Sequence, residues 1–196
     1  IEAKFVNVSI DDVRSNLTKL GAVLEQPMRL MKRVTIDSDF MRSNNAFLRI
    51  RDEGNKITIT YKQFDSLSVD GAKEIETTVG DFAVAVSLVA AIGIPHKSYQ
   101  ETKRETWKLD DTEVVIDVWP WLNPYIEIEG PSETRVKDVA SLLGFQWENA
   151  VFGDVMEAYK IQYPHLKKSD TVGNIPEVKF NTPLPDLFVA TSRHYI

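Results

Sequence analysis

Charged side chains recur two positions apart in several short segments of the chain, with aliphatic residues between them. In an extended strand, residues i and i+2 share a face, so each segment places its charges on one side and its aliphatics on the other. The acids lie mainly near the two ends of the set and the bases mainly in its middle. If these strands share a sheet, one face holds Lys and Arg that could grip an anion beside carboxylates that could hold a metal ion. That combination predicts a site for a polyphosphate with its divalent cation. The segments are 2–5, 48–51, 57–62, 73–76, 114–117 and 125–129.

The elements that would position these charges alternate between strands and helices. Helices are indicated by apolar stripes at helical spacing, with a polar residue at several starts and Gly at several ends. Short turns at 52–55 and 110–111 join alternating runs as hairpins, which requires antiparallel pairing. The sequence therefore predicts an α+β domain. Its predicted strands lie near 2–8, 28–37, 46–52, 56–63, 72–79, 98–109, 113–119 and 124–129, and its predicted helices near 10–20, 81–92, 132–143 and 150–160.

Eight strands in one domain are best accommodated by closing the sheet into a barrel, because closure removes exposed strand edges. The charged face is then either the barrel's lumen or its solvated exterior. A half-solvated antiparallel sheet with helices on its apolar face is common, so a purely structural role for the charges is a real alternative. Long paired bases such as Arg49 and Arg51 favour the lumen, since a solvated face would tolerate Ser, Thr or Gln equally well.

Composition narrows the class of protein. With 196 residues, of which 43% are hydrophobic, the chain can bury one good core. A net charge of −6 argues against a nucleic-acid partner, and the bases are interleaved with acids as suits a small, highly charged ligand. The absence of cysteine excludes disulfides and thiolate metal sites, and no apolar run is long enough to span a membrane. No signal peptide is visible, so we expect a cytoplasmic protein without a membrane partner.

An ordered set of motifs resembles the CYTH superfamily, also called the triphosphate tunnel metalloenzymes. Glu2-x-Lys4 is similar to the end of the family's Glu-x-Glu-x-Lys motif, whose first Glu would fall one position before Ile1, and we expect a truncation there. The resemblance extends from residue 1 to about 160. It continues through Leu-Arg-Ile-Arg (48–51), Thr-Tyr-Lys (60–62), Glu-Ile-Glu (74–76), Lys-Arg (103–104), Ile-Asp (116–117) and Ile-Glu-Ile-Glu-Gly (126–130).

The resemblance implies a closed, eight-stranded antiparallel β tunnel with a charged lumen and helices packed outside. It also implies a divalent metal, Mg²⁺ or Mn²⁺, and a triphosphate chain held by bases. Hard oxygen ligands and guanidinium forks suit those two roles. Carried over by position, the phosphate-binding residues would be Lys4, Arg33, Arg49, Arg51, Lys62 and Arg104. Catalytic metal ligands would be Glu2, Glu127 and Glu129, with Asp117, Glu74 and Glu76 as further ligands or as partners of the bases.

Two chemistries fit such a site. The family includes inorganic triphosphatases, thiamine triphosphatases and class IV adenylyl cyclases, which implies hydrolysis of tripolyphosphate or thiamine triphosphate, or conversion of ATP into cyclic AMP and pyrophosphate. Hydrolysis requires only the features visible in the sequence, whereas cyclisation needs a purine pocket that the sequence does not reveal. A non-catalytic protein that binds polyphosphate or nucleotide is the alternative from another class. The chain would act as a monomer or a homodimer.

Three other features of the sequence say less about function: the histidines, an aromatic turn and the C-terminal segment. His96, His165 and His194 are scattered without metal-ligand spacing. The aromatic turn 119–125 is expected to be a packed hairpin, or else a rim that stacks on a base or a thiamine ring. We assign 1–163 to the tunnel domain and 164–196 to an irregular, proline-containing tail.

Overall fold

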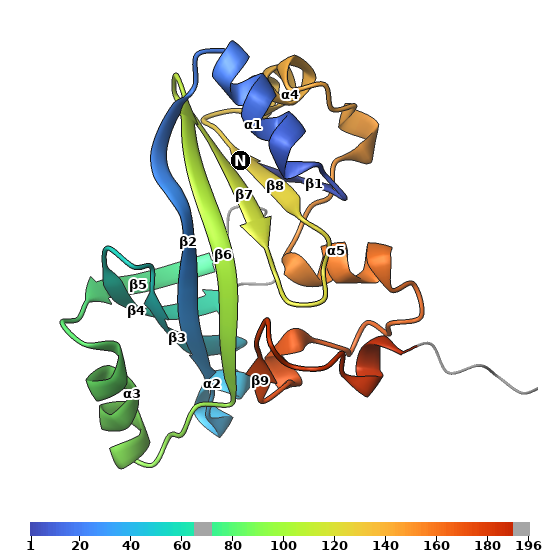
Figure 1. Ribbon diagram of the computed structural model, residues 1–196. Helices are drawn as coiled ribbons and strands as arrows, with labels where there is room; N and C mark the ends of the chain where they lie inside the picture. Colours follow the sequence, from blue (N-terminus) through green and yellow to red (C-terminus); the bar gives the residue numbers. More distant parts are fainter. Residues whose placement is uncertain (65–71, 190–196) are drawn as a thin grey trace, which may run out of the picture. The chain divides into compact units, whose positions relative to one another are not determined.

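The computed structural model describes residues 1–64 and 72–189, and these form an α+β fold, as predicted (Figure 1). Its strands are β1 (Glu2–Val6), β2 (Val23–Ile36), β3 (Ala46–Asp52), β4 (Ile57–Phe64), β5 (Ala72–Thr78), β6 (Ser98–Leu109), β7 (Thr112–Val118), β8 (Tyr125–Glu129) and β9 (Glu177–Val178). The helices are α1 (Ile10–Lys19), α2 (Asp39–Ser43), α3 (Phe82–Ala91), α4 (Glu133–Leu142) and α5 (Val155–Gln162). Short 3₁₀ helices cover Trp147–Asn149 (η1), Val172–Asn174 (η2) and Asp186–Phe188 (η3).

The strands pair in the order β1-β8-β7-β6-β2-β3-β4-β5, and β9 pairs with β6. The pairs β1–β8, β8–β7, β7–β6, β2–β3, β3–β4 and β4–β5 are antiparallel, whereas β9 runs parallel to β6. The predicted antiparallel sheet is therefore confirmed, while its closure into a tunnel stays a prediction.

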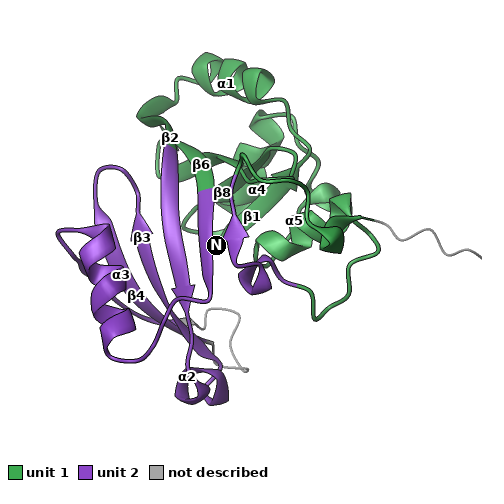
Figure 2. Cartoon of the chain, turned by 60° about the horizontal axis from the view of Figure 1, so that its bottom comes forward, with its two compact units in different colours: residues 1–29, 102–170, 180–196 green, residues 30–101, 171–179 purple. Residues whose placement is uncertain are grey.

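The described chain divides into two compact units, each made of discontinuous segments (Figure 2). Unit 1 contains residues 1–29, 102–170 and the chain from 180 onward, and unit 2 contains 30–101 and 171–179. The long strands β2 and β6 contribute residues to both units.

In unit 1, α1 and α4 cover the apolar face formed by β1, β8, β7 and part of β6 (Figure 1). Ile116 and Ile128 are fully buried in this core, which confirms that they face helices. The α4 helix begins where the Ser132 hydroxyl accepts from the Arg135 amide at 3.2 Å, and it ends before Gly144, whose φ of 90° only glycine adopts freely. The core also holds Ala3, Phe5, Val13, Leu17, Val114, Ile126, Val136, Val139, Ala140 and Leu143.

In unit 2, α3 covers the apolar face of β2, β3 and β4. Val34 and Ile50 are buried there, and Ile59 packs beside them; the alternation predicted this direction for Ile50 and Ile59. The Asp81 carboxylate accepts from the Val84 amide at 2.8 Å and so starts α3 at the predicted place. Because Val34 and Ile50 point towards α3, the alternating residues of the same strands point to the opposite face.

Several boundaries differ from the sequence-based expectation. Strand β2 begins at Val23 rather than near 28, and α2 was not predicted. The last helix, expected over 150–160, begins only at Val155 because Val151 exchanges two backbone hydrogen bonds with Lys4, each 2.9 Å long. The segment expected to be irregular carries η2, β9 and η3, and its residues 190–196, including His194, lie outside the described residues.

No helix among the described residues is both long and apolar enough to cross a membrane.

Candidate functional site

The charged face of unit 2 is rich in bases. Opposite residues in paired strands share a face, and Arg33 lies opposite Arg51 while Thr35 lies opposite Arg49. Strand β4 adds Lys62 two positions beyond Thr60, which lies opposite Arg49. All of these alternate with the residues that face α3, so the structure brings four predicted phosphate ligands onto one face: Arg33, Arg49, Arg51 and Lys62.

The arginines of this face are largely desolvated. The side chains of Arg49 and Arg51 are only 11% and 20% exposed. Burial, and next the charge of Arg51, lowers the pKa of Arg49 to about 10. Among the described residues, no hydrogen-bond partner is found for Nε of either arginine, or for the buried hydroxyls of Thr35 and Thr58. Buried donors without acceptors are costly, and an anion would satisfy them.

Carboxylates on the same face pair with the bases. Glu53 lies 2.5 Å from Arg51, and Glu74 lies 2.6 Å from Lys62. Glu76 accepts a 2.6 Å hydrogen bond from the Thr60 hydroxyl, which, more than the nearby bases, lowers its pKa. We call this side of the unit 2 sheet, with Arg33, Arg49, Arg51 and Lys62, the cationic face. Glu74 and Glu76 contact side chains of this face, which fits one of the two roles expected for them, as partners of the bases. Glu53 was not predicted as a site residue, because it belongs to a hairpin turn, where acidic side chains are usually solvated.

The charged face of unit 1 is dominated by acids. Register places Glu2 opposite Glu129, and Lys4 opposite Glu127. The Lys4 ammonium contacts the Glu2 carboxylate and lies 3.3 Å from Glu127. Four predicted residues of β1 and β8 thus share one face.

Strands β6 and β7 complete this acidic face. Arg104 lies opposite Asp117, and its guanidinium hydrogen-bonds both oxygens of that carboxylate, at 2.7 and 2.5 Å. The same Nη2 atom donates to Glu127 at 2.9 Å. Glu113, which lies opposite Glu129, also belongs here although it was not predicted. Its position four residues before Asp117 in an alternating strand was the signal that could have revealed it.

Burial and charge pairing compete in the acidic face. Burial, and next the charge of Asp117, raises the pKa of Glu127. Burial alone would lower the pKa of Lys4, but the charges and hydrogen bonds of Glu127 and Glu2 outweigh it, so that pKa is raised. Arg104 behaves in the same way: burial opposes its charge, yet Asp117 raises its pKa well above the usual value. The pKa of Glu113 is raised by burial first and then by the charges of Glu129 and Glu25, against Arg104.

The donors of this face suit a hard divalent cation, since they are carboxylate oxygens on adjacent strands. As the side chains stand, no three acidic, His or Cys side chains of the described residues gather closely enough to hold an ion. The predicted metal ligands also divide between the units: Glu74 and Glu76 belong to unit 2, whereas the others belong to unit 1. Those others are Glu2, Asp117, Glu127 and Glu129.

The aromatic turn between β7 and β8 is a packed connection. The Tyr159 hydroxyl of α5 donates to the Pro120 carbonyl at 2.6 Å, and the hydroxyl of Tyr163, which follows α5, donates to the Trp121 carbonyl at 2.5 Å. The Trp121 indole donates to the Thr182 carbonyl at 3.0 Å. These contacts favour the packed-hairpin interpretation over the stacking rim.

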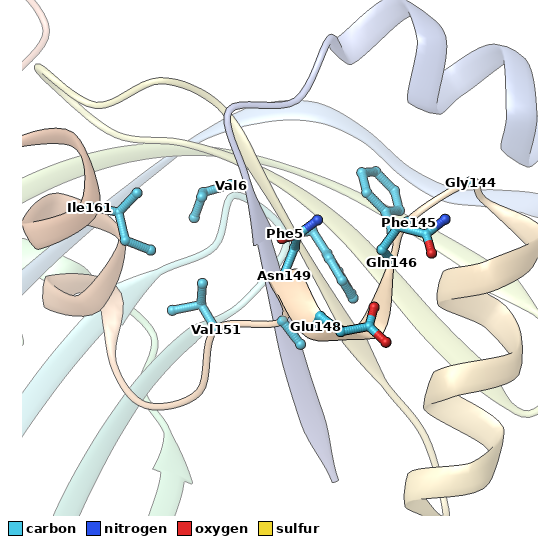
Figure 3. A pocket seen from close by; sticks show the side chains of 10 residues that line it. Phe5, Val6, Gly144, Phe145, Gln146, Glu148, Asn149, Val151 and Ile161 are labelled. Carbon is cyan, nitrogen blue, oxygen red and sulfur yellow. The ribbon is translucent and has the colours of Figure 1, made fainter.

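A hollow of about 520 Å³ lies in unit 1 beside β1 (Figure 3). The described residues around it include one carboxylate, Glu148, and no Lys or Arg. Most of its lining is apolar, with Phe5 and Val151 among the labelled side chains. It therefore lacks the chemistry of a polyphosphate site.

The ordered charges and the fold agree with a family model: residues 33–149 match the CYTH domain, and the chain belongs to the CYTH family. Glu2 and Lys4 precede the matched stretch.

Similar solved structures share the fold. The PH1012 protein from Pyrococcus horikoshii is 23% identical, covering 81% of this chain and 98% of its own, with a TM-score of 0.65. A candidate adenylate cyclase from Vibrio parahaemolyticus is 11% identical, covering 82% and 97%, with a TM-score of 0.67. The candidate adenylyl cyclase HpAC1 from Hippeastrum, for which a dominant triphosphatase activity is described, is 16% identical, covering 85% and 97%, with a TM-score of 0.53. No curated protein matches the chain.

Proposed function

We propose that the protein is a divalent-metal-dependent triphosphatase that hydrolyses an inorganic or organic triphosphate. The observation that carries this proposal is the cationic face of unit 2, where Arg49 and Arg51 are buried with Nε atoms that lack a partner among the described residues. Buried donors without an acceptor are costly, and the oxygens of a bound anion would satisfy them.

In this proposal, basic side chains bind the phosphate chain and carboxylates bind the metal ion. The phosphate oxygens are bound by Arg33, Arg49, Arg51 and Lys62. Each guanidinium can donate two parallel hydrogen bonds to phosphate oxygens, whereas the lysine acts as a point charge. Glu53 and Glu74 hold Arg51 and Lys62 in place. On the acidic face, Glu2, Glu127 and Glu129 would hold Mg²⁺ or Mn²⁺, with Lys4 beside the first two.

When bound, the metal ion neutralises charge on the phosphate oxygens. Hydrolysis then needs positioning more than a covalent nucleophile. Water attacks the terminal phosphorus, the bond to the bridging oxygen breaks, and orthophosphate and diphosphate leave, with a proton released to solvent. The bases of unit 2 stabilise the charge that gathers on the departing diphosphate. A closed tunnel would exclude water from these charges and strengthen each contact.

The family resemblance alone leaves two reactions open, and HpAC1 supports hydrolysis because a triphosphatase activity is described as dominant in that protein. The deciding assay offers tripolyphosphate, thiamine triphosphate and ATP with Mg²⁺ or Mn²⁺, and resolves orthophosphate, pyrophosphate and cyclic AMP. We expect orthophosphate and strict dependence on metal. Pyrophosphate with cyclic AMP would establish a cyclase instead, and tight binding without product would establish a sensor.

A matched pair of variants ties the activity to the cationic face. Arg51→Gln removes a buried base of the face, whereas Arg42→Gln removes an exposed arginine that pairs with Asp37 and Asp39 elsewhere in unit 2. We expect only the first change to weaken triphosphate binding. Equal affinity in both variants would contradict the assignment.

A further inference from the structure

Helix α3 has an apolar surface on the side turned away from the sheet that it covers (Figure 2). Its inward side packs on the core of unit 2 through Phe82 and Val89. Its outward side carries Val84, Leu88 and, at the C-cap, Ile92, which are 64%, 61% and 67% exposed. No residue from 82 to 95 has an ionisable side chain, so this exposed surface contains no charge of its own.

The other two helices of the same length, α1 and α4, do not have such a surface. Each carries four charged residues, whereas α3 carries none. Leu142 of α4 is 55% exposed, but Asp138 precedes it by about one helical turn, and a single exposed leucine is ordinary on a protein surface. A contiguous apolar patch is not ordinary, and it indicates a contact with another surface.

The apolar character continues on the sheet. Ile75 of β5 is 60% exposed and lies opposite Tyr61 of β4. Tyr61 in turn lies opposite Leu48, which packs in the core beneath α3. Ile75 therefore lies on the same side of the sheet as α3, and exposed apolar side chains on this side are not confined to the helix.

The surface of α3 is complementary to itself in shape. Residues four apart on a helix form ridges, and two such ridges lie side by side on the exposed surface. One consists of large side chains and the other of small ones, so the second forms a groove beside the first. On two copies related by a twofold axis, the large ridge of each fits the groove of the other, at the crossing angle of about −50° that is commonest between helices. The large ridge is Val84, Leu88 and Ile92, and the small one is Ala83, Ser87 and Ala91.

The lack of charge also favours an identical partner. A twofold contact brings each patch against its own counterpart, so a charged patch would meet like charges and be repelled. The surface of α3 avoids that repulsion. A partner recognised by its charges, in contrast, would find no opposite charge on this helix.

We propose that α3 is the interface of a homodimer, with a twofold axis close to Ser87 and Leu88 in the middle of the ridge. A helix of 10 residues is about 15 Å long, so the contact is smaller than the roughly 800 Å² per partner of a standard interface. We therefore expect a reversible dimer that forms at micromolar concentrations. The interface lies on the side of the unit 2 sheet opposite the cationic face, and the inference does not rest on the proposed function.

Sedimentation velocity tests this on the full-length chain. Over about 1 to 500 µM protein, the range of weak interfaces, the wild type should pass from monomer to dimer. Leu88→Glu introduces a carboxylate from each copy, so the dimer dissociation constant should rise by more than about 100-fold. The matched control is Leu142→Glu, the same change at a leucine of similar exposure, which should leave that constant within about twofold.

Cross-linking places the interface independently. The chain contains no cysteine, so an introduced thiol is the only one. Ser87→Cys puts this thiol at the proposed twofold axis, whereas Ser141→Cys puts it beside Leu142 on the control helix. Both serines are exposed, so neither change disturbs a core. A short bismaleimide should join two copies of Ser87→Cys and should leave Ser141→Cys monomeric.

A wild type that stays monomeric over the whole range would overturn the proposal and leave the apolar patch for an unlike partner. A dimer that survives Leu88→Glu, or that cross-links at position 141 and not at 87, would place the interface elsewhere and overturn it too. None of these outcomes depends on triphosphate binding, so the proposed function can hold or fail separately.

Discussion

The charged faces of the two units are built from the same residue types but are in opposite electrostatic states. In unit 2, Arg49 is buried beside another base, and its pKa is lowered to about 10. In unit 1, burial also opposes the charge of Arg104, yet Asp117 overcomes the effect of burial and the pKa of Arg104 is raised. The difference teaches that a buried arginine indicates an anion site where it keeps a donor without a hydrogen-bond partner among the described residues, as Nε of Arg49 does.

Removing one carboxylate from the acidic face should have the largest effect. Glu129→Gln keeps the shape of the side chain but removes a charge opposite Glu2 and Glu113. We expect turnover to fall by more than about 100-fold, while tripolyphosphate binding without metal survives or improves because a repulsive charge is gone. Steady-state kinetics and metal-free calorimetry measure the two quantities. Glu133→Gln, on the exposed start of α4, is the control, and full metal-dependent activity in Glu129→Gln would make the acidic face structural.

Removing a base from the cationic face should have the next largest effect. Hydrogen bonds to charged groups contribute about 1.5–3 kcal/mol, so Arg51→Gln should weaken tripolyphosphate binding roughly 10- to 150-fold. Lys62→Gln tests the same face through its β4 position. Unchanged dissociation constants in both variants would remove the cationic face from the site.

A pH titration sharpens the contrast through Arg49, and its expected effect is several-fold. This group is protonated below its pKa of about 10 and loses its charge above it. A bound anion favours the charged form, so tripolyphosphate affinity should fall from about pH 10 upward and not below it. Lysines titrate near pH 10.4 too, so the informative quantity is the difference between wild type and Arg49→Gln across pH 8 to 11. Parallel curves would show that Arg49 does not contact the anion.

The smallest expected effect concerns stability without ligand. Since the charged form of Arg49 is disfavoured by burial at neutral pH, Arg49→Met should raise the thermal midpoint of the anion-free protein by about 2–4 °C, the size of a ~1 kcal/mol change. It should also abolish the stabilisation that tripolyphosphate gives to the wild type. Differential scanning calorimetry with and without the anion measures both, and a lower midpoint would indicate that Arg49 is compensated.

Local periodicity was enough to predict most of the fold. The alternation in 48–51 placed Arg49 and Arg51 on one face and Ile50 on the other, and polar caps with terminal glycines marked α3 and α4. The short elements and the start of α5 could not be predicted, because they depend on contacts between distant residues. Val151 pairs with Lys4 of β1, and β9 pairs with residues 99–100 of β6.

The site was predictable as a set of residues but not as a set of partners. Alternation indicates which side chains share a face, and it indicated Lys62 and Glu127 correctly in that sense. It carries no information on which acid neutralises which base, because that depends on the register between strands. Hence Arg104 was assigned with the phosphate-binding bases although its geometry pairs it with Asp117.

The discontinuity of unit 1 has a consequence for synthesis on the ribosome. The backbone nitrogen of Ile1 donates to the carbonyl of Gly130, 129 positions further along the chain, and β1 pairs with β8 over the same span. Residues 30–101, most of unit 2, emerge as one piece before β8 exists, so unit 2 can begin to fold while β1 still lacks its partner. Until β8 leaves the exit tunnel, Ala3 and Phe5, both buried in the finished protein, have no sheet to join. During that interval β1 exposes apolar side chains and an unpaired strand edge, the kind of segment that chaperones shield.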